Sequence, residues 1–198
     1  MPKEVFKTLS QDKQKNLIEK SYLVFAQKTY HKTSINDLTN ELDITRTAFY
    51  YYFYNKDDLY TYLIQLEKEA FMNNYIYHSD TKLLLEDIFT NLFIFLSQKK
   101  KTYMQAFYMD LFMNISLAQQ NALLDKLLLF HGEYSHFIGY QYYNLDNEFL
   151  ANEITLILFS IVTRQIIAYY RDDLSLDEAK VQLSKKINLI KNGIKEGK

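Results

Sequence analysis

The 198-residue chain lacks cysteine altogether and contains one proline and four glycines. Without cysteine it forms no disulfide and offers no thiolate to a metal or a substrate, which fits a reducing compartment. The proline is Pro2, and all four glycines follow residue 131. Because sheets with many turns use these residues, their scarcity predicts an all-α protein of long helices with short polar connections.

Long hydrophobic runs and a secretory signal are missing as well. The longest uncharged stretch, between Asp110 and Asp125, and the most apolar one, between Glu153 and Arg164, are both shorter than the about 20 residues that cross a bilayer. No charged segment followed by an apolar run opens the chain. We therefore expect a soluble, cytoplasmic protein, with 48% hydrophobic residues available for its core.

Two further absences concern charge and catalysis. The net charge is −1, although residues 1–56 hold nine Lys and Arg against six Asp and Glu. This excess is compatible with DNA binding by the N-terminal part, and counts this small also arise at random.

No glycine loop precedes residue 131, no zinc-protease motif is present, and scattered Ser, His and Asp residues do not make a triad without geometry. The chain is predicted not to be an enzyme and to require no cofactor.

What the sequence does contain is a run of six aromatic residues from Phe49 to Tyr54. On a helix, Phe49 and Phe53 share one face, so we expect both in the core. The three tyrosines between them then point elsewhere. With Arg46 and Lys56 nearby, their hydroxyls suit a row of phosphate oxygens.

Helix-start signals frame this run. Ser10 caps a helix to about Lys28, Ser34 and Asp37 form a capping box before a short helix, and Thr45 caps the next one. Helix, short turn and helix inside a three-helix head is the helix-turn-helix layout, in which the second helix of the pair enters the major groove. Here that helix covers about residues 46–52.

The remaining chain carries helix signals throughout. The expected helices cover about 55–77, from 79 to the lysine run at 99–101, 103–115, one or two within 117–143, 146–171 and 175–198. The last one opens on a capping box, and its apolar stripe is Leu176, Ala179, Leu183, Ile187, Ile190 and Ile194. We predict about nine helices in two domains, a helix-turn-helix domain over residues 1–55 and a larger helical domain over residues 56–198.

One block resembles the tetracycline-repressor-like (TetR) family of transcriptional regulators. It reads Phe25-Ala26, Tyr30, Thr33-Ser34-Ile35-x-Asp37-Leu38, Ile44-Thr45-Arg46-x-x-Phe49-Tyr50-x-x-Phe53-x-Asn55-Lys56-x-x-Leu59. About 35 residues carry the match without a gap. The total length, with a longer helical C-terminal part, is also similar to this family.

Three positions depart from the family pattern. Thr29 and Asp43 stand where the family usually has glycine, and Tyr54 stands where it usually has proline. Asp tolerates a left-handed backbone, whereas β-branched Thr avoids positive φ, so we expect an altered loop around Thr29 that shifts Lys32. Without proline, the recognition helix is expected to run half a turn longer.

The resemblance implies a set of DNA contacts. Arg46 is the candidate for reading a base, because Arg pairs well with guanine, and Lys32, Lys56 and the Ser34 end of the preceding helix would contact phosphates. The full set is Lys32, Ser34, Thr45, Arg46, Thr47, Tyr50, Tyr51, Tyr52 and Lys56.

The resemblance also implies a homodimer and an effector site. In the family the last two helices pack against their copies as a four-helix bundle, so the operator should be a pseudo-palindrome. Alternatively, these helices close the core of one chain. Residues that could line an effector cavity are Phe71, Tyr75, Phe93, Met104, Phe107, Tyr108, Met109, Phe112, Phe130, Tyr134 and Phe137. Ordinary core packing is the alternative for each.

A few polar residues leave alternatives open. Asp110 and Arg164 sit in apolar surroundings, where they orient a ligand, pair with each other or simply lie at the surface. His78, His131 and His136 are candidates for a metal or haem site, although a spacing of five places His131 and His136 poorly on one helical face.

The sequence as a whole predicts a DNA-binding transcriptional repressor, released from its operator by a small apolar or aromatic molecule. The alternative is a non-catalytic helical protein-binding module whose head docks another protein and binds no DNA. Membrane partners are not expected.

Overall fold

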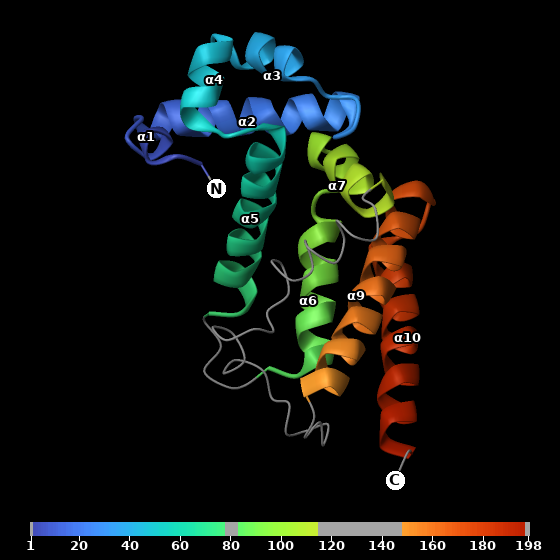
Figure 1. The fold of residues 1–198 in the computed structure, drawn as a ribbon. Helices are drawn as coiled ribbons and strands as arrows, with labels where there is room; N and C mark the ends of the chain where they lie inside the picture. The colour runs from blue at the N-terminus through green and yellow to red at the C-terminus, as the bar shows by residue number, and fades with distance from the viewer. Residues whose placement is uncertain (1, 78–82, 115–147, 197–198) are drawn as a thin grey trace. The chain divides into compact units, whose positions relative to one another are not determined.

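The computed structural model describes residues 2–77, 83–114 and 148–196, and these residues form nine helices (Figure 1). The helices are α1 (Glu4–Lys7), α2 (Gln11–Lys28), α3 (Ile35–Leu42), α4 (Arg46–Tyr52), α5 (Lys56–Tyr75), α6 (Leu85–Ser97), α7 (Tyr103–Asn114), α9 (Glu148–Arg171) and α10 (Leu176–Glu196). The predicted all-α class is confirmed.

By packing, the chain divides into two compact units. The first contains the described residues up to Glu69 and those from Lys101 to Asn114, which are α1 to α4, most of α5, and α7. The second contains Ala70 to Lys100 and the described residues from Glu148 onward. This division concerns packing, and the functional boundary at residue 55 stays a prediction.

Side-chain caps explain where several helices begin. The Oγ atoms of Ser10 and Ser34 accept hydrogen bonds from backbone N–H groups three residues further on, as predicted. Ser34 and Ser175 also form the predicted reciprocal boxes, because the carboxylates of Asp37 and Glu178 accept from the serine N–H groups at 2.9 Å. Caps of this kind stabilise a helix by about 1 kcal/mol each.

Some helix bounds differ from the predictions. The short helix α1 was not predicted. The helix expected from residue 79 begins only at Leu85, because Leu84 has the extended backbone of an N-cap (φ −73°, ψ 150°). The helix expected to reach residue 77 ends at Tyr75. The helices predicted within 117–143 lie outside the described residues.

The core of the first unit lies where α2 packs along α7 and where α5 meets both. Phe25 and Phe107 are fully buried. The ring of Phe25 lies 4.9 Å from that of Tyr60, and the ring of Phe107 lies 5.1 Å from that of Tyr22. Both contacts are edge-on, the arrangement that aromatic pairs prefer. These contacts pack α2, which precedes the helix-turn-helix, against α5 and α7.

In the second unit, α6, α9 and α10 lie side by side (Figure 1). Ala179, Leu183 and Ile187 of the predicted α10 stripe are buried inside this unit. Leu176 and Ile190 are half-buried, and the side chain of Ile194 is not described. Part of the stripe therefore closes the core of its own chain, as the alternative interpretation proposed.

Helix α9 contains a segment, Glu153–Arg171, that is long and apolar enough for a membrane span by length and composition. The core helix of a soluble protein passes the same test. Val162 and Ile166 of this segment are fully buried. The buried Gln165 donates to Gln182 and accepts from Lys186, both on α10. These contacts are those of a core helix.

Candidate nucleic-acid interface

Helices α3 and α4 are joined by a turn of three residues. Asp43 adopts the left-handed conformation (φ 53°, ψ 49°) that was expected where the family has glycine. The next residue, Ile44, donates its N–H to the Thr39 carbonyl at 3.1 Å. The Oγ of Thr45 then accepts from Ala48 N at 3.1 Å and caps α4 as predicted. The local geometry is that of a helix-turn-helix.

The aromatic run on α4 is divided by its helical phase. Phe49 and Phe53 are buried, with 0% and 2% of their surface exposed. Tyr50 and Tyr51 are exposed by 38% and 60%. The two phenylalanines anchor α4 to the first unit, and the two tyrosines point outward, as the spacing predicted.

Tyr52 does not point outward, and this part of the prediction was wrong. Its side chain is only 8% exposed and packs edge-on against Phe6 at a centroid distance of 6.0 Å. Phe6 belongs to α1, the helix that was not predicted. Tyr52 also follows Phe49 by three residues, a spacing that places it beside the buried face of α4. That spacing is the signal that sequence reasoning missed.

The first turn of α4 presents polar side chains to solvent. Arg46 and Thr47 are exposed. The Arg46 Nη1 lies 3.4 Å from Asn36 Oδ1, and its guanidinium lies 5.8 Å from the centre of the Tyr50 ring. These contacts orient the guanidinium while leaving most of its five N–H donors free for another acceptor.

The C-terminal end of α4 is held by Lys3. The Lys3 backbone N–H donates to Tyr52 O at 2.9 Å, and its ammonium donates to Tyr50 O at 2.8 Å. The ammonium also lies 4.3 Å from the centre of the exposed Tyr54 ring. Two carbonyls at the helix end, which lack a partner within the helix, are thereby satisfied. Sequence reasoning did not find this role of Lys3.

This arrangement corrects the expectation of a longer recognition helix. Helix α4 ends at Tyr52, and Phe53 is extended (φ −129°, ψ 150°). Tyr54 N then donates to Asp58 Oδ2, and the Oδ1 of Asn55 accepts from Asp58 N, which starts α5. Helix α4 therefore ends without a proline, because Phe53 is buried in an extended conformation and the cap of α5 begins directly after it.

The loop between α2 and α3 contains a strained residue. Thr29 has positive φ (φ 64°, ψ 158°). We expected an altered loop that avoids this conformation, and the structure does not have one. A β-branched residue in this region costs of order 1–3 kcal/mol. The Thr33 backbone N–H and hydroxyl both donate to Thr29 O, at 3.1 and 2.6 Å. The loop therefore holds its own shape in part.

Lys32 and Ser34 follow on this loop, and both are exposed. The Ser34 hydroxyl, besides capping α3, donates to Asp37 Oδ2 at 2.8 Å. Lys28 forms an ion pair with the other Asp37 oxygen at 2.5 Å. The hydrogen bond from Lys28, and then those from Ser34, hold the pKa of Asp37 below its usual range. Hydrogen bonds and an ion pair thus hold the start of α3, and the exposed side chain of Lys32 lies on the loop before it.

Lys56 points toward the loop instead of outward. Its half-buried ammonium donates to Tyr30 O at 2.7 Å and to Thr33 O at 3.0 Å. The same ammonium lies 4.3 Å from the centre of the Tyr30 ring. Lys56 was predicted to contact a phosphate. In the structure its donors are directed at the loop, so its first role is to hold the loop in place.

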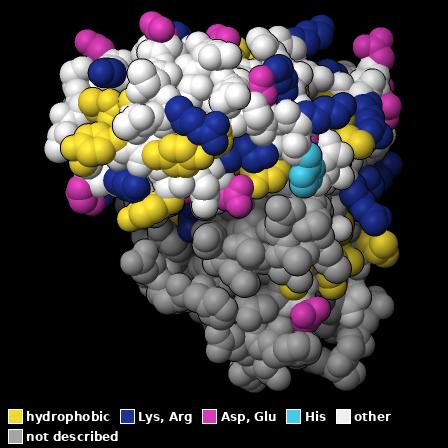
Figure 2. All heavy atoms as spheres, turned by 45° about the horizontal axis from the view of Figure 1, so that its top comes forward, with side chains coloured by type: hydrophobic (Ala, Val, Ile, Leu, Met, Phe, Trp, Pro, Cys, Tyr) yellow, Lys and Arg dark blue, Asp and Glu magenta, His cyan; other side chains and the backbone are white. Residues whose placement is uncertain are grey.

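Figure 2 shows the face above α2 to α4, with the top of Figure 1 turned forward. Lys and Arg side chains lie among hydrophobic-coloured side chains, a class that includes tyrosine, and acidic side chains are scattered between them. Tyr50 and Tyr51 are exposed in this part of the chain, and a phosphate backbone accepts hydrogen bonds from cations and from phenol hydroxyls alike.

The comparisons with known proteins address the same segment. Residues 17–63 match the family model of bacterial regulatory proteins, tetR family. The predicted resemblance to this family is thus confirmed over residues 17–63, the segment that contains the helix-turn-helix. This match supports a DNA-binding regulator as the function of the chain. No curated protein matches the chain at a significant level.

Solved structures share the fold over nearly the whole chain. A TetR-like regulator from Rhodococcus sp. RHA1 has a TM-score of 0.60 at 17% identity, covering 94% of this chain and 97% of its own. A TetR family regulator from Chloroflexus aurantiacus has a TM-score of 0.55 at 23% identity, covering 98% of both chains. A fatty acid degradation regulator from Bacillus halodurans has a TM-score of 0.60 at 15% identity, covering 90% of this chain and 98% of its own.

The residues predicted to line an effector cavity fall into three groups. Met104, Phe107, Tyr108, Met109 and Phe112 lie on α7 in the first unit. Phe71, Tyr75 and Phe93 belong to the second unit. Phe130, Tyr134 and Phe137 lie outside the described residues.

Most of the described members make the contacts of core side chains. Phe107 packs against Tyr22 and Tyr60, and the Tyr108 hydroxyl donates to Glu67 at 2.7 Å. In the second unit, the Phe71 ring lies 5.6 Å from that of Tyr75 and 5.7 Å from that of Phe95, and the Phe93 ring lies 6.0 Å from that of Tyr169. The effector cavity stays a prediction.

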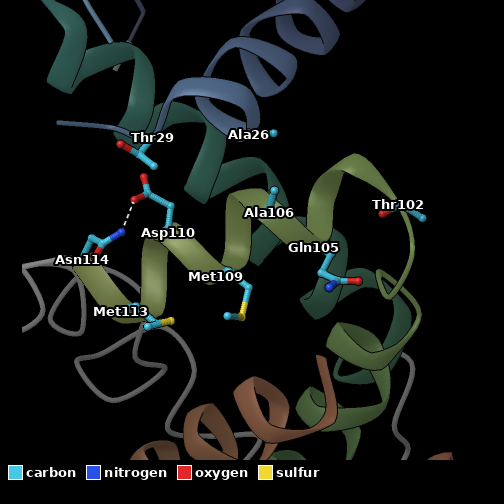
Figure 3. A pocket seen from close by; sticks show the side chains of 9 residues that line it. All are labelled: Ala26, Thr29, Thr102, Gln105, Ala106, Met109, Asp110, Met113 and Asn114. Atoms are coloured by element: carbon cyan, nitrogen blue, oxygen red, sulfur yellow. Dashed lines mark hydrogen bonds between the residues drawn. The ribbon is translucent and has the colours of Figure 1, made fainter. Parts of the chain in front are cut away.

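Beside α7, the first unit has an open hollow of about 550 Å³ (Figure 3). It is lined by Ala26, Thr29, Thr102, Gln105, Ala106, Met109, Asp110, Met113 and Asn114. Thr29, Asp110 and Asn114 lie together at one end, where Asp110 accepts from Asn114 Nδ2 at 2.7 Å. At this end of the hollow, the polar side chains are thus hydrogen-bonded within the first unit.

The remaining polar candidates have separate environments. Asp110 is buried and accepts from Tyr30 N, whereas Arg164 is exposed on α9. Within the described ranges, no group of three or more His, Asp or Glu side chains could hold a metal ion. The His31 Nε2 lies 3.0 Å from Asn114 O. His78, His131 and His136 lie outside the described residues.

Proposed function

We propose that this protein is a cytoplasmic homodimeric repressor of the TetR family that leaves a pseudo-palindromic operator when a small apolar or aromatic molecule binds. The observation that carries the proposal is the division of α4 into two faces. Phe49 and Phe53 anchor the helix, while Arg46, Thr47 and Tyr51 are exposed along the opposite side. A helix presented in this way is what the major groove receives.

The residues of this surface differ in role. Arg46 is the base-reading candidate, because its guanidinium is exposed and a bidentate pair with guanine gives about 1–3 kcal/mol of discrimination. Thr45, Thr47, Tyr50 and Tyr51 have hydroxyls for phosphate oxygens, and Lys32 and the Ser34 end of α3 extend the contact. Lys56 acts through the loop that it holds.

The dimer would form through exposed side chains of α9 and α10. Ile157 is 44% exposed on α9, and Val181 and Leu189 are 54% and 74% exposed on α10. These three remain available after the inner stripe of α10 has packed within its own chain. A second copy would bury them in a four-helix bundle. Leu189→Glu should therefore yield monomers in analytical ultracentrifugation. The control Ser184→Glu introduces the same side chain at an exposed position away from the face that Val181 and Leu189 share, and it should leave the dimer intact.

Release by an effector requires that the molecule bind the DNA-free arrangement more tightly, with a coupling free energy of typically about 1–3 kcal/mol. The aromatic and apolar composition of the central helices supports an apolar effector. The similar fold of a fatty acid degradation regulator adds fatty acids to the compounds worth testing.

Enrichment from a random duplex pool tests the proposed function. The full chain is incubated with duplexes that contain a randomised centre, and bound DNA is recovered and sequenced over several rounds. We expect an enriched pseudo-palindrome, with two half-sites that mirror the two-fold dimer. A protein-docking module would bind no duplex even at low salt, and that outcome would reject the proposal.

A further inference from the structure

The backbone strain at Thr29 needs an external support, because a conformation that β-branched residues avoid persists only where neighbouring contacts hold it. The bonds from Thr33 to Thr29 O lie within the loop itself. These bonds fix the curvature of the loop but do not attach it to the other helices. The attachment must come from other helices of the first unit.

Tyr30, the next residue, is held at both of its backbone groups by charged side chains. Its N–H donates to Asp110 Oδ2 at 2.6 Å, and its carbonyl accepts from Lys56 Nζ at 2.7 Å. Its hydroxyl also donates to Asp57. Burial, and then this hydrogen bond, raise the pKa of Tyr30 above its usual value. Hydrogen bonds to charged partners are the strong ones in proteins, so Tyr30 is the fixed point of the loop.

Asp110 is the support on α7. Its side chain is only 5% exposed, and its second oxygen accepts from Asn114 Nδ2 at 2.7 Å (Figure 3). A buried carboxylate is costly unless it is hydrogen-bonded. Here one of its two oxygens is committed to a backbone N–H 80 residues away in the sequence. The buried carboxylate is therefore satisfied by two hydrogen bonds, of which the one to Tyr30 N joins α7 to the loop.

We propose that Asp110 is a positioning residue for DNA binding. It holds the Tyr30 N–H, keeps Thr29 in its strained conformation and thereby fixes Lys32 and the Ser34 end of α3 against the DNA backbone. Asp110 itself touches no DNA. This inference rests on the proposed function, since it assigns a role in the same interface.

Asp110→Asn is the first test, because it keeps the size of the side chain but loses the charge. The single carbonyl oxygen of Asn can accept from Tyr30 or from Asn114, but it replaces two oxygens. We expect an about fivefold weaker affinity for the enriched duplex, and about tenfold for Asp110→Ala, the size of effect that one net hydrogen bond gives. Met113→Ala, an exposed change on the same helix, is the control and should have wild-type affinity.

A second change separates positioning from a general loss of stability. Thr29→Gly removes the strain, because Gly adopts positive φ freely. In the Gly background the loop needs less support, so Asp110→Asn should weaken DNA binding by less than twofold. Equal losses in the Thr and Gly backgrounds, or wild-type affinity of both Asp110 variants, would overturn the proposal.

Hydrogen exchange at the Tyr30 amide tests the support without DNA. We expect protection of this amide in the wild-type protein and at least about tenfold faster exchange in Asp110→Asn, while the α2 amides are unchanged. If the wild-type protein binds no duplex, the proposed function fails, and the exchange result still decides whether Asp110 holds the loop. An unchanged Tyr30 amide would overturn that role.

Discussion

The two segments that present the DNA-binding surface are held in different ways. Helix α4 is anchored by apolar burial, with Phe49 and Phe53 inside and Arg46 and Tyr51 left outward. The loop between α2 and α3 is held by polar bonds, chiefly from Lys56 and Asp110. Most polar side chains on α4 are therefore free to contact a partner, whereas several of those around the loop serve to position it. Residue type alone does not separate these roles, and the hydrogen bonds do.

The largest expected effect comes from removing the anchor of α4. Phe49→Ala empties a fully buried site and should reduce the free energy of unfolding by about 3–5 kcal/mol. Tyr51→Ala, two residues away and exposed, should change it by less than about 0.5 kcal/mol. Urea unfolding of both variants measures the difference. Similar losses would mean that the phase of the aromatic run is wrong.

The loop is tested by comparing a positioning lysine with a contacting one. Lys56→Met removes two hydrogen bonds to loop carbonyls and should lower both the free energy of unfolding, by about 1–3 kcal/mol, and the DNA affinity. Lys32→Met should leave stability unchanged and reduce the salt slope of DNA binding by about 1, as expected for one lost phosphate contact. Thermal unfolding and binding titrations at several salt concentrations provide both readouts. The comparison fails if Lys56→Met unfolds like the wild-type protein.

Within α4, base reading is separated from backbone contact. Arg46→Ala should relax sequence preference at one position of each half-site, where the lost discrimination is about 1–3 kcal/mol. Tyr51→Ala should weaken binding to all duplexes alike, because phosphate contacts carry no sequence information directly. Repeating the duplex enrichment with each variant measures this. An unchanged sequence preference of Arg46→Ala would remove it as the base reader.

The smallest expected effect is a pH dependence at the start of α3. The pKa of Asp37 is lowered in the folded protein, so its ionised form stabilises the fold above the unfolded pKa of about 4. That contribution is lost as the pH falls below about 4 toward the folded pKa. Asp37→Asn should therefore show a flatter loss of stability in this acid range. Thermal unfolding between pH 5 and pH 2, roughly the window of an Asp titration, checks this. A wild-type profile in the variant would exclude Asp37 as a source of the acid sensitivity.

The sequence predicted those features that depend on local chemistry. The caps Ser10, Ser34 and Thr45, the left-handed Asp43 and the inward Phe49 all follow from residue types at fixed spacings. Contacts between distant segments could not be predicted in this way. Nothing local indicates that Lys3 closes the end of α4, that Phe6 covers Tyr52, or that Asp110 binds the Tyr30 N–H.

The two main errors of prediction have the same origin. Tyr52 was assigned to the outer face of α4, although a helix from the N-terminal segment covers it. The expected extension of α4 ignored the cap of α5 and the bonds from Lys3. In each case, tertiary contacts decided what the aromatic run and the missing proline left open.

The most direct test of DNA binding through this surface is the salt dependence of affinity for the enriched duplex. Between about 50 and 200 mM salt, a protein that contacts several phosphates loses affinity steeply, with a slope of about −0.9 per phosphate in a logarithmic plot. We predict such a slope for the wild-type chain and a shallower one for Lys32→Met. Affinity that does not change with salt, or no binding at the lowest salt, would contradict the account.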